Sequence, residues 1–405
     1  MRQRTAKRLP PDADKLVSLS LALFASGSRI EDRYWEEKLD VLLAKLIRNG
    51  NQTTLDAALD HLQQNHPDTY GALADIAETQ SESLSVELEG QRYDTLLVAI
   101  PILAWTRYAI PAGLVKPDLA EALRTHLQAH VLATGTRVAM APFLYSIDQL
   151  PRHHVETFRL TQQLAHAAVG TQALKLNFGD LPETSPILAD PRFLLAVVAA
   201  PAGAALFRWQ EEEGGSRIER SSCLEQWTTQ GGPNLTLALP GCEFECLLPD
   251  AYYSACRDAD ERIRPHTIRT AIRYLFDTIG VTPQELRAVT AGFGERRIDE
   301  YRVGFTRRGN NDVMYGVVWP LYGRENGEAV GDDTMIEHDE AVDGPLEEIV
   351  TLLREAGVND IRRHAGRFEP EYCDDCGAPL YADPLGEIVH AEMPEEASPT
   401  QPHFH

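Results

Sequence analysis

The feature that most constrains the fold of this chain is a pair of cysteines near its C-terminal end. Cys373 and Cys376 are separated by two aspartates and followed directly by Gly377. Two cysteines at this spacing can wrap a turn around one zinc ion, which proteins hold tetrahedrally with Cys and His ligands. Structural zinc sites normally have four protein ligands, so the pattern predicts that a later part of the chain folds back onto this turn.

Histidines after the cysteine pair can supply the missing ligands. Residues 379–390 are predicted to form a short hairpin that turns at 383–386, which carries the histidine at its end back towards the thiolates. The two histidines in the last three residues are two positions apart, so an extended backbone points both to one side. The predicted ligands of a structural zinc ion are Cys373, Cys376 and His390, with His403 or His405 as the fourth.

Two other interpretations of the cysteine pair stay open. One is a reduced pair of thiols in a flexible acidic tail whose histidines are incidental. A redox role is less favoured, because no predicted strand leads into a helix that starts at the pair.

The composition limits the class of protein and of partner. With 405 residues, 43% of them hydrophobic, the chain can bury large cores and is expected to divide into two or three domains. The formal charge of -23 disfavours broad binding to nucleic acid or anionic membranes, because the field of the whole molecule repels polyanions. Six cysteines are too few for a disulfide scaffold, so we expect a reducing cytoplasm.

No transmembrane helix is predicted, since the long uncharged stretch 193–207 is too short for a membrane span and contains Pro201 and Gly203. A basic N-terminus before the apolar run 16–25 superficially resembles a signal peptide. The acidic residues Asp12 and Asp14 beside that run favour an ordinary helix instead.

Hydrophobic periodicity predicts a mixed α/β (α+β) protein. Residues 1–85 follow a helical pattern, and strand and helix patterns then alternate. The predicted divisions are a helical region (1–85), a first α/β lobe (90–185), a second α/β lobe with hairpins (190–368) and a zinc-knuckle-like tail (369–405).

The elements expected in the first lobe are strands at 95–103, 137–142 and 173–178 and helices at 117–132 and 154–167. The second lobe is expected to contain hairpins within 207–219 and 301–321, a helix at 345–356 and a strand at 361–368. A similar order recurs about 98 residues later, as Leu150-Pro151 and Leu248-Pro249 illustrate, so an internal duplication is a hypothesis.

Two histidines stand four residues apart on the predicted helix 117–132. This spacing places His126 and His130 on one face, where they can form a metal or acid/base site between the lobes. The glutamate that an HExxH hydrolase uses is missing, because Leu127 follows His126. Hydrogen-bonded core histidines are the preferred interpretation.

Residues 262–308 are locally basic in an otherwise acidic chain. His266, Arg269 and Arg273 align along a helix expected to begin at Pro265. Guanidinium groups match carboxylates and phosphates, so this segment can hold an anionic small ligand, a phosphate or a short stretch of RNA. Docking against the acidic segment 332–343 of the same chain is the preferred alternative.

Three stretches together carry a resemblance to a known family. They are residues 26–36, the run 96–113, which contains Ile100-Pro101-Ile102-Leu103-Ala104-Trp105, and the turn at 373–380. The chain resembles, over nearly its whole length, a betaproteobacterial family carried as a domain of unknown function. That resemblance implies a bacterial cytosolic protein and transfers no activity. The cysteine turn by itself resembles half of a zinc ribbon whose second CxxC is missing.

The sequence favours a non-catalytic cytoplasmic protein in which a zinc-stabilised tail serves folding or recognition of a protein or small-ligand partner. The alternative is an enzyme or sensor that binds an anionic small molecule between the lobes, with Arg269 and Arg273 holding the anion and His126 or His130 transferring protons. Contact with RNA is disfavoured by the net charge, and no membrane partner is expected.

Overall fold

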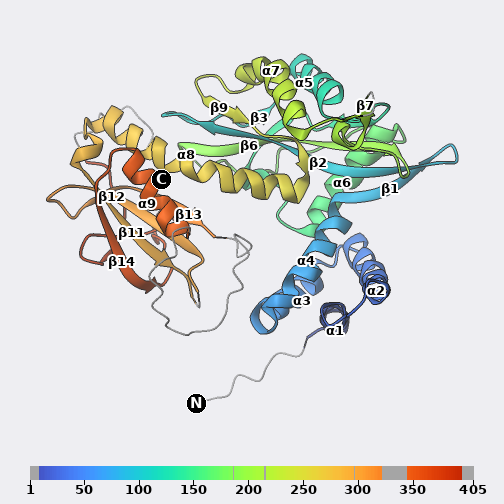
Figure 1. Ribbon diagram of the computed structural model, residues 1–405, viewed down its shortest axis with the longest axis horizontal. Helices are drawn as coiled ribbons and strands as arrows, with labels where there is room; N and C mark the ends of the chain where they lie inside the picture. Colours follow the sequence, from blue (N-terminus) through green and yellow to red (C-terminus); the bar gives the residue numbers. More distant parts are fainter. Residues whose placement is uncertain (1–8, 186, 214–215, 296, 322–343, 395–405) are drawn as a thin grey trace.

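The computed structural model describes residues 9–185, 187–213, 216–295, 297–321 and 344–394. It confirms the predicted mixed α+β class. The chain begins with four helices, α1 (Pro11–Phe24), α2 (Arg29–Arg48), α3 (Gln52–Asn65) and α4 (Pro67–Glu82), which lie together at one side of the molecule (Figure 1). Helix α2 starts where its sequence indicates, because the Ser28 hydroxyl accepts a hydrogen bond of 3.2 Å from the amide of Glu31. Leucines from these helices share one core, so the four helices form a bundle.

Two long antiparallel strands form the centre of the large sheet. Strand β2 (Gln91–Trp105) pairs with β6 (Ala189–Pro201) from Tyr93 opposite Pro201 to Trp105 opposite Ala189. Both strands are apolar almost throughout, because both faces of this sheet are covered. The predicted division at residues 185–190 therefore falls between two strands that belong to one sheet.

The order strand, helix, two short strands, helix occurs twice in this part of the chain. The first copy contains β2, α5 (Pro117–His130), β4 (Arg137–Met140), β5 (Phe143–Ser146) and α6 (His154–Val169). The second contains β6, α7 (Arg220–Ala238), β9 (Glu243–Cys246), β10 (Asp250–Ala251) and α8 (Tyr252–Ile279). The short strands are exchanged: β4 and β5 pair with β6, whereas β9 and β10 pair with β2. The two segments thus complete each other's half of the sheet, and the internal duplication stays a hypothesis.

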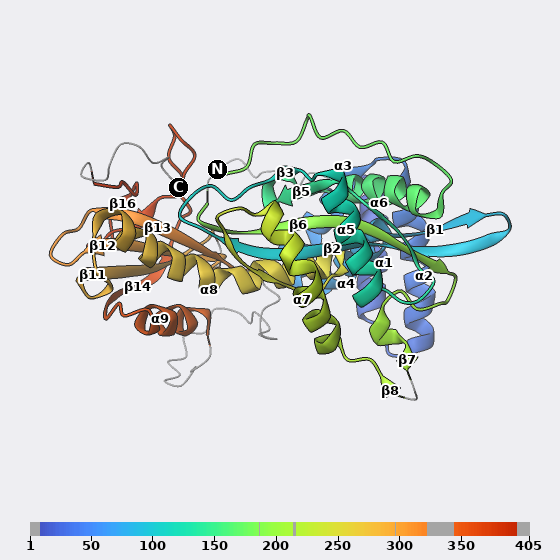
Figure 2. The ribbon, with the colours of Figure 1, turned by 90° about the horizontal axis from the view of Figure 1, so that it is seen from above.

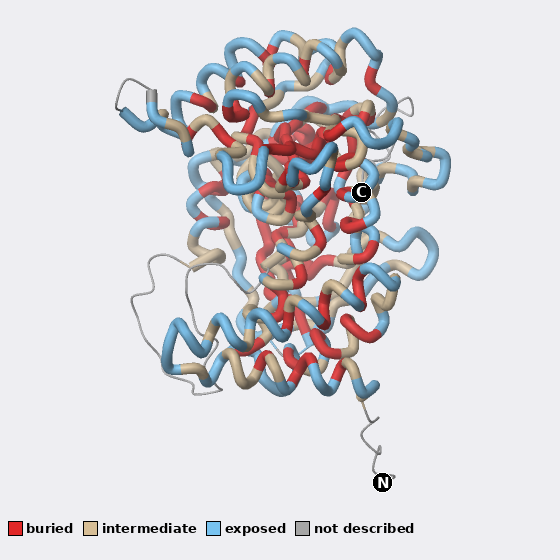
Figure 3. The backbone as a smooth tube through the Cα atoms, turned by 90° about the vertical axis from the view of Figure 1, so that its right-hand side faces the viewer, coloured by how far each residue is buried: buried red, intermediate tan, exposed pale blue. Residues whose placement is uncertain are grey.

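Two helices cover each face of the large sheet, one from each of the two segments. Apolar residues of α5 and α7 share a core with the side chains of Val98 and Ile100 on one face of β2. Those of α6 and α8 share a core with Leu97 and Ala99 on the other face. Figure 2 shows α5 and α7 in front of the two long strands. Figure 3 shows the buried residues concentrated between the sheet and these helices.

Helix α8 connects the large sheet to a second body. Its first half packs on the sheet through Ala255, Ala259 and Ile263, and its second half belongs to another core through Ile268 and Leu275. The expectation that a helix begins at Pro265 is wrong, because Pro265 lies inside a helix that starts at Tyr252. Packing on both sides maintains this helix although proline removes one backbone hydrogen bond.

The second body is built on a four-stranded sheet. Its strands are β11 (Leu286–Phe293), β12 (Glu300–Arg307), β13 (Val313–Pro320) and β14 (Asp360–Phe368), in the order β13-β12-β11-β14. The first three form antiparallel pairs, whereas β14 runs parallel to β11 after helix α9 (Pro345–Glu355). Figure 1 shows this body beside the far end of α8. It ends in a small hairpin, β15 (Tyr381–Ala382) and β16 (Ile388–Val389).

Most of the expected elements are confirmed, and one strand is wrong. Residues 173–178 form no strand, although Leu174, Leu176 and Phe178 contact the core of the large sheet. The Phe178 ring stacks on Phe143 at a centroid distance of 4.7 Å, so alternating apolar residues are buried here without a backbone ladder. The hairpin expected within 207–219 is shorter than predicted: β7 (Glu212–Glu213) pairs with β8 (Ser216–Arg217), and residues 208–210 form a 3-10 turn.

Short flanking strands complete the large sheet. They are β1 (Ser83–Leu88), which pairs with β2, and β3 (Gly113–Leu114), which pairs with β5. Within the described ranges, no helix is both long and apolar enough to cross a membrane.

Candidate metal centre and ligand cavity

Three of the predicted metal ligands lie together in the structure. One donor atom from each of Cys373, Cys376 and His390 falls within a group whose members are all within 4.8 Å of one another. The Cys376 Sγ lies 3.3 Å from the His390 Nε2. The predicted fourth ligands, His403 and His405, lie outside the described residues.

The backbone of the cysteine turn explains how both thiols reach one point. The amide of Cys373 donates to the carbonyl oxygen of Ala378, and the amide of Gly377 donates back to that of Cys373, each at 2.8 Å. Gly377 has φ 73°, a left-handed conformation that glycine adopts at no steric cost. The two bonds close the turn with both cysteines on it.

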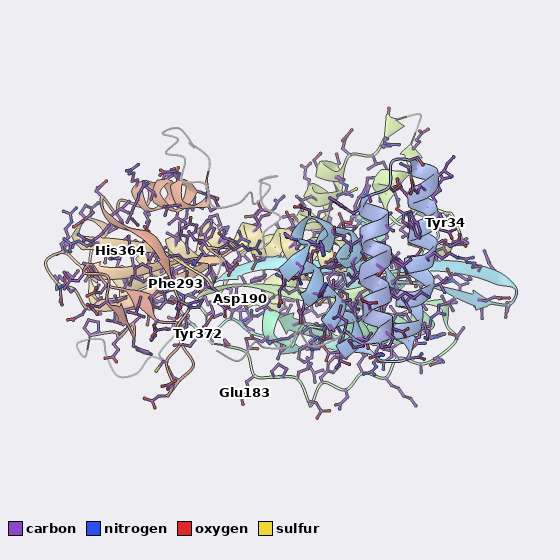
Figure 4. All side chains as sticks on the ribbon, turned by 90° about the horizontal axis from the view of Figure 1, so that it is seen from below. Tyr34, Glu183, Asp190, Phe293, His364 and Tyr372 are labelled. Atoms are coloured by element: carbon purple, nitrogen blue, oxygen red, sulfur yellow. The ribbon has the colours of Figure 1, made fainter. Side chains whose placement is uncertain are left out.

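The hairpin that carries His390 turns where the sequence predicts. The Asp383 carboxylate accepts hydrogen bonds from the amides of Leu385 and Glu387, at 2.8 and 2.9 Å. The Asp383 carbonyl oxygen lies 2.8 Å from the Nε2 of His364 on β14. Figure 4 labels His364 in the body of the second sheet, which also contains Phe293 and Tyr372. The turn is thus stabilised both by hydrogen bonds within the hairpin and by the contact with His364 of the four-stranded sheet.

A buried arginine connects the cysteine turn to the sheet. Arg302 on β12 is 1% exposed, and its Nη1 donates to the carbonyl oxygens of Glu371 and Leu380, which flank the turn. Its Nε donates to Glu300 at 2.6 Å. The guanidinium also lies over the rings of Phe293 and Tyr372, at 4.3 and 5.1 Å. Arg302 therefore fixes both ends of the segment that contains the cysteines.

The donor set suits a soft or borderline metal ion. Hydrogen bonds from the backbone of Cys376 and then of Asp375 lower the pKa of the Cys373 thiol, which favours the thiolate that binds metals. Two thiolates and an imidazole are ligands that zinc accepts at one tetrahedral site. The residues therefore fit a zinc ion, which would cross-link the turn to the hairpin.

A separate cavity contains the predicted anion-binding residues. It has a volume of about 690 Å³ and lies where the end of β2, the start of β9 and helix α8 meet. His266, Arg269 and Arg273 all line it, as the helical spacing predicts. Trp105 lines it too, with its ring stacked on His266 at a centroid distance of 4.1 Å.

The charged groups of this cavity have partners within the chain. Arg273 lies 3.3 Å from Glu243 and 3.8 Å from Asp277, and Arg269 lies 3.6 Å from Glu355. These side chains are half or more exposed except for Asp277, so the ion pairs are weak and can be exchanged for a ligand. Burial lowers the pKa of His266, and Glu245 opposes that effect. The acidic segment 332–343, expected to pair with these arginines, lies outside the described residues.

The two histidines of α5 are not part of this cavity. His126 and His130 are half-buried and stack on each other at a centroid distance of 5.8 Å. Burial, followed by the charges of His126 and Arg208, lowers the pKa of His130. Neither histidine lines the cavity with Arg269 and Arg273, so the structure does not bring the predicted proton-transfer and anion-binding groups together.

Two residues of these sites were not predicted from the sequence. Arg302 is a charged residue at an inward-facing position of the apolar strand β12. Such a position is the sequence signal that could have indicated a buried, hydrogen-bonded arginine. Trp105 is a large, half-buried ring at the end of the apolar run of β2, and this position is the signal that marks it.

Comparison with known proteins identifies a family but no individual relative. No curated protein and no solved structure matches the chain significantly. A family model described as "Protein of unknown function (DUF2863)" matches residues 1–404, in agreement with the resemblance of the three sequence stretches. The chain therefore belongs to the DUF2863 family.

Proposed function

We propose that this is a non-catalytic cytoplasmic protein in which a structural zinc ion stabilises the C-terminal module for binding a protein or small-ligand partner. The observation that carries the proposal is the convergence of Cys373, Cys376 and His390 within 4.8 Å. His403 or His405 completes the tetrahedral site in this proposal. Four protein ligands leave no open position for a substrate, so such a zinc ion acts on folding rather than catalysis.

The small size of the C-terminal hairpin supports a structural role for the metal. Strands β15 and β16 have two residues each, and isolated two-stranded hairpins are marginally stable in water. A zinc ion that joins the cysteine turn to His390 would close this module by coordinate bonds, and the free energy of metal binding would add to the stability of the fold. Cys373 and Cys376 form no disulfide, so both sulfur atoms are available to bind the metal.

Metal analysis of the purified protein tests the zinc proposal. We expect about one equivalent of zinc in the wild type and a large loss in the variant with both Cys373→Ser and Cys376→Ser. Cys242→Ser is the matched control, because this half-buried thiol belongs to no group of metal donors within the described residues. Zinc content near zero in the wild type, or unchanged in the double variant, contradicts the proposal. Loss of zinc on His403→Ala or His405→Ala identifies the fourth ligand.

A second candidate function is the binding of an anionic small molecule in the cavity of α8. The observation that favours it is that His266, Arg269 and Arg273 line one cavity, next to Trp105. Calorimetric titration with inorganic phosphate tests it, with Arg269→Gln and Arg273→Gln expected to weaken binding. Arg262→Gln is the matched control, since Arg262 is an exposed, ion-paired residue of the same helix outside the cavity. Binding of RNA remains disfavoured by the charge of -23.

A further inference from the structure

The cavity beside α8 offers aromatic surface as well as positive charge. Trp105 is half-buried, Tyr108 is 51% exposed, and both line the cavity. The indole Nε1 of Trp105 donates to Glu243 at 3.2 Å, which fixes the plane of the ring. An aromatic side chain held in one orientation at a solvent-accessible cavity is a platform on which a planar ring can stack.

The stack already present shows how a ligand ring can be accommodated. Trp105 and His266 lie nearly parallel, with an interplanar angle of 21°. Because both residues line the cavity, an incoming planar ring can extend this stack. The volume of about 690 Å³ is within the range of small-molecule sites and exceeds what a lone inorganic anion needs.

The charges around the cavity define the polar part of the ligand. Its lining has three arginines and two acidic residues, so it is locally positive on a chain of charge -23. Arg269 and Arg273 are one helical turn apart on the same face of α8, and both are exposed. Their guanidinium groups can bind one phosphate or carboxylate between them.

The two acidic residues limit how much negative charge fits. The Glu243 carboxylate contacts both Trp105 and Arg273, and Asp277 lies one turn beyond Arg273. A long polyphosphate would meet these carboxylates, whereas a single anionic group can avoid them. Glu243 can also accept a hydrogen bond from the N–H group of a heteroaromatic ring that stacks on its neighbour.

We propose that this cavity binds a nucleoside monophosphate, whose base extends the stack of Trp105 and His266 and whose phosphate pairs with Arg269 and Arg273. The inference rests on the second candidate function and adds to it the chemical class of the ligand. The cavity lies where the large sheet and the second body share α8, a common location for ligand sites between domains.

Calorimetric titration of the full chain with AMP, GMP, CMP and UMP tests the proposal, with the four matching nucleosides and inorganic phosphate as separate arms. We expect at least one monophosphate to bind more tightly than either separate part. Trp105→Leu is expected to weaken that binding by about tenfold or more through loss of stacking. Arg269→Gln with Arg273→Gln is expected to weaken it by a similar factor.

Two variants serve as matched controls for these substitutions. Trp35→Leu removes a half-buried tryptophan of α2, and Arg262→Gln removes an arginine of α8 outside the cavity. Neither should change binding. If Trp105→Leu fails to fold, the double arginine variant, whose changes lie on exposed side chains, gives the same test for the phosphate half of the site.

The possible results separate the two proposals. Failure of all four monophosphates to bind at millimolar concentration overturns the nucleotide assignment. If inorganic phosphate binds as tightly as the monophosphates and Trp105→Leu changes nothing, the nucleotide assignment is overturned and the general anion site stands. If phosphate and monophosphates all fail to bind, both are overturned.

Discussion

The guanidinium of Arg302 donates a 2.8 Å hydrogen bond to the carbonyl oxygen of Glu371, two residues before the first cysteine of the metal centre. Arg302→Met removes this bond and leaves Glu300 without its buried partner. We expect the free energy of unfolding of the second body to fall by about 3 kcal/mol and zinc affinity to fall with it. Chemical denaturation and competition with a chromophoric chelator measure the two effects.

Arg297→Met is the control for this substitution. Arg297 forms an ion pair of 3.0 Å with Asp299 near the same strand, but its side chain is 41% exposed. Its loss should change stability by less than about 1 kcal/mol. An equally small effect of Arg302→Met would contradict the role assigned to the buried arginine.

Gly316→Ala is expected to displace the hairpin that carries His390. A Cβ atom at Gly316 would lie 2.1 Å from the Tyr381 ring, and Tyr381 belongs to β15. We expect a loss of about 1–3 kcal/mol in stability, together with weaker zinc binding, measured by thermal melting in the presence and absence of a chelator. Gly27→Ala, where nothing lies within 4 Å of the added atom, should leave both unchanged.

Asp383→Ala should loosen the same hairpin from its turn. The variant loses the carboxylate that accepts from the amides of Leu385 and Glu387, which we expect to cost about 2 kcal/mol. Zinc affinity should fall by roughly fivefold if about half of that loss is felt at the metal centre. Asp383→Asn keeps an acceptor oxygen and should restore most of the affinity, and a failure of this rescue would point to a role for the charge itself.

Glu82→Gln should change the pH dependence of stability. Burial raises the pKa of Glu82 to about 7, although the carboxylate accepts a hydrogen bond from the amide of Tyr253 at the start of α8. The folded state therefore holds this proton more tightly than the unfolded chain, so stability is lost as pH rises from about 4.5 to about 7.

The glutamine variant cannot ionise and should be more stable than wild type at pH 8 by about 3 kcal/mol. At pH 4.5 and below the two proteins should be nearly equal. Denaturation curves across this pH range give the comparison, and Glu87→Gln on the exposed side of β1 is the control. A stability difference that does not grow with pH would show that Glu82 is not the titrating group.

The strands and helices with strong periodicity could be predicted from the sequence. Helix α5 and strand β4 begin at the expected residues, because proline at the first helical turn and an apolar pattern after a turn are local signals. The prediction of a strand at 173–178 was wrong because alternating apolar residues indicate burial on one side. Leu174 and Leu176 are partly buried without a hydrogen-bonded neighbouring strand. The exchange of short strands between β2 and β6 depends on long-range pairing, which no local pattern records.

The residues of the two candidate sites also divide into those that local sequence patterns predict and those that depend on long-range contacts. Cysteine spacing and a turn at Asp383 were enough to predict that His390 returns to Cys373 and Cys376, because every contact lies within 20 residues. Arg302 and Trp105 come from strands that are distant in sequence from the groups they contact. Their roles required the tertiary structure.

The exchange of short strands between β2 and β6 also determines whether one half of the large sheet can form without the other. A chain with one copy of the repeat would have a central strand whose flanking partners belong to a second molecule, since β9 and β10 complete β2 while β4 and β5 complete β6. A single copy would therefore leave an edge of its long strand unpaired unless two such chains exchanged their short strands. In the present protein both sets of short strands belong to one polypeptide, so we expect either half expressed alone to expose unpaired strand edges.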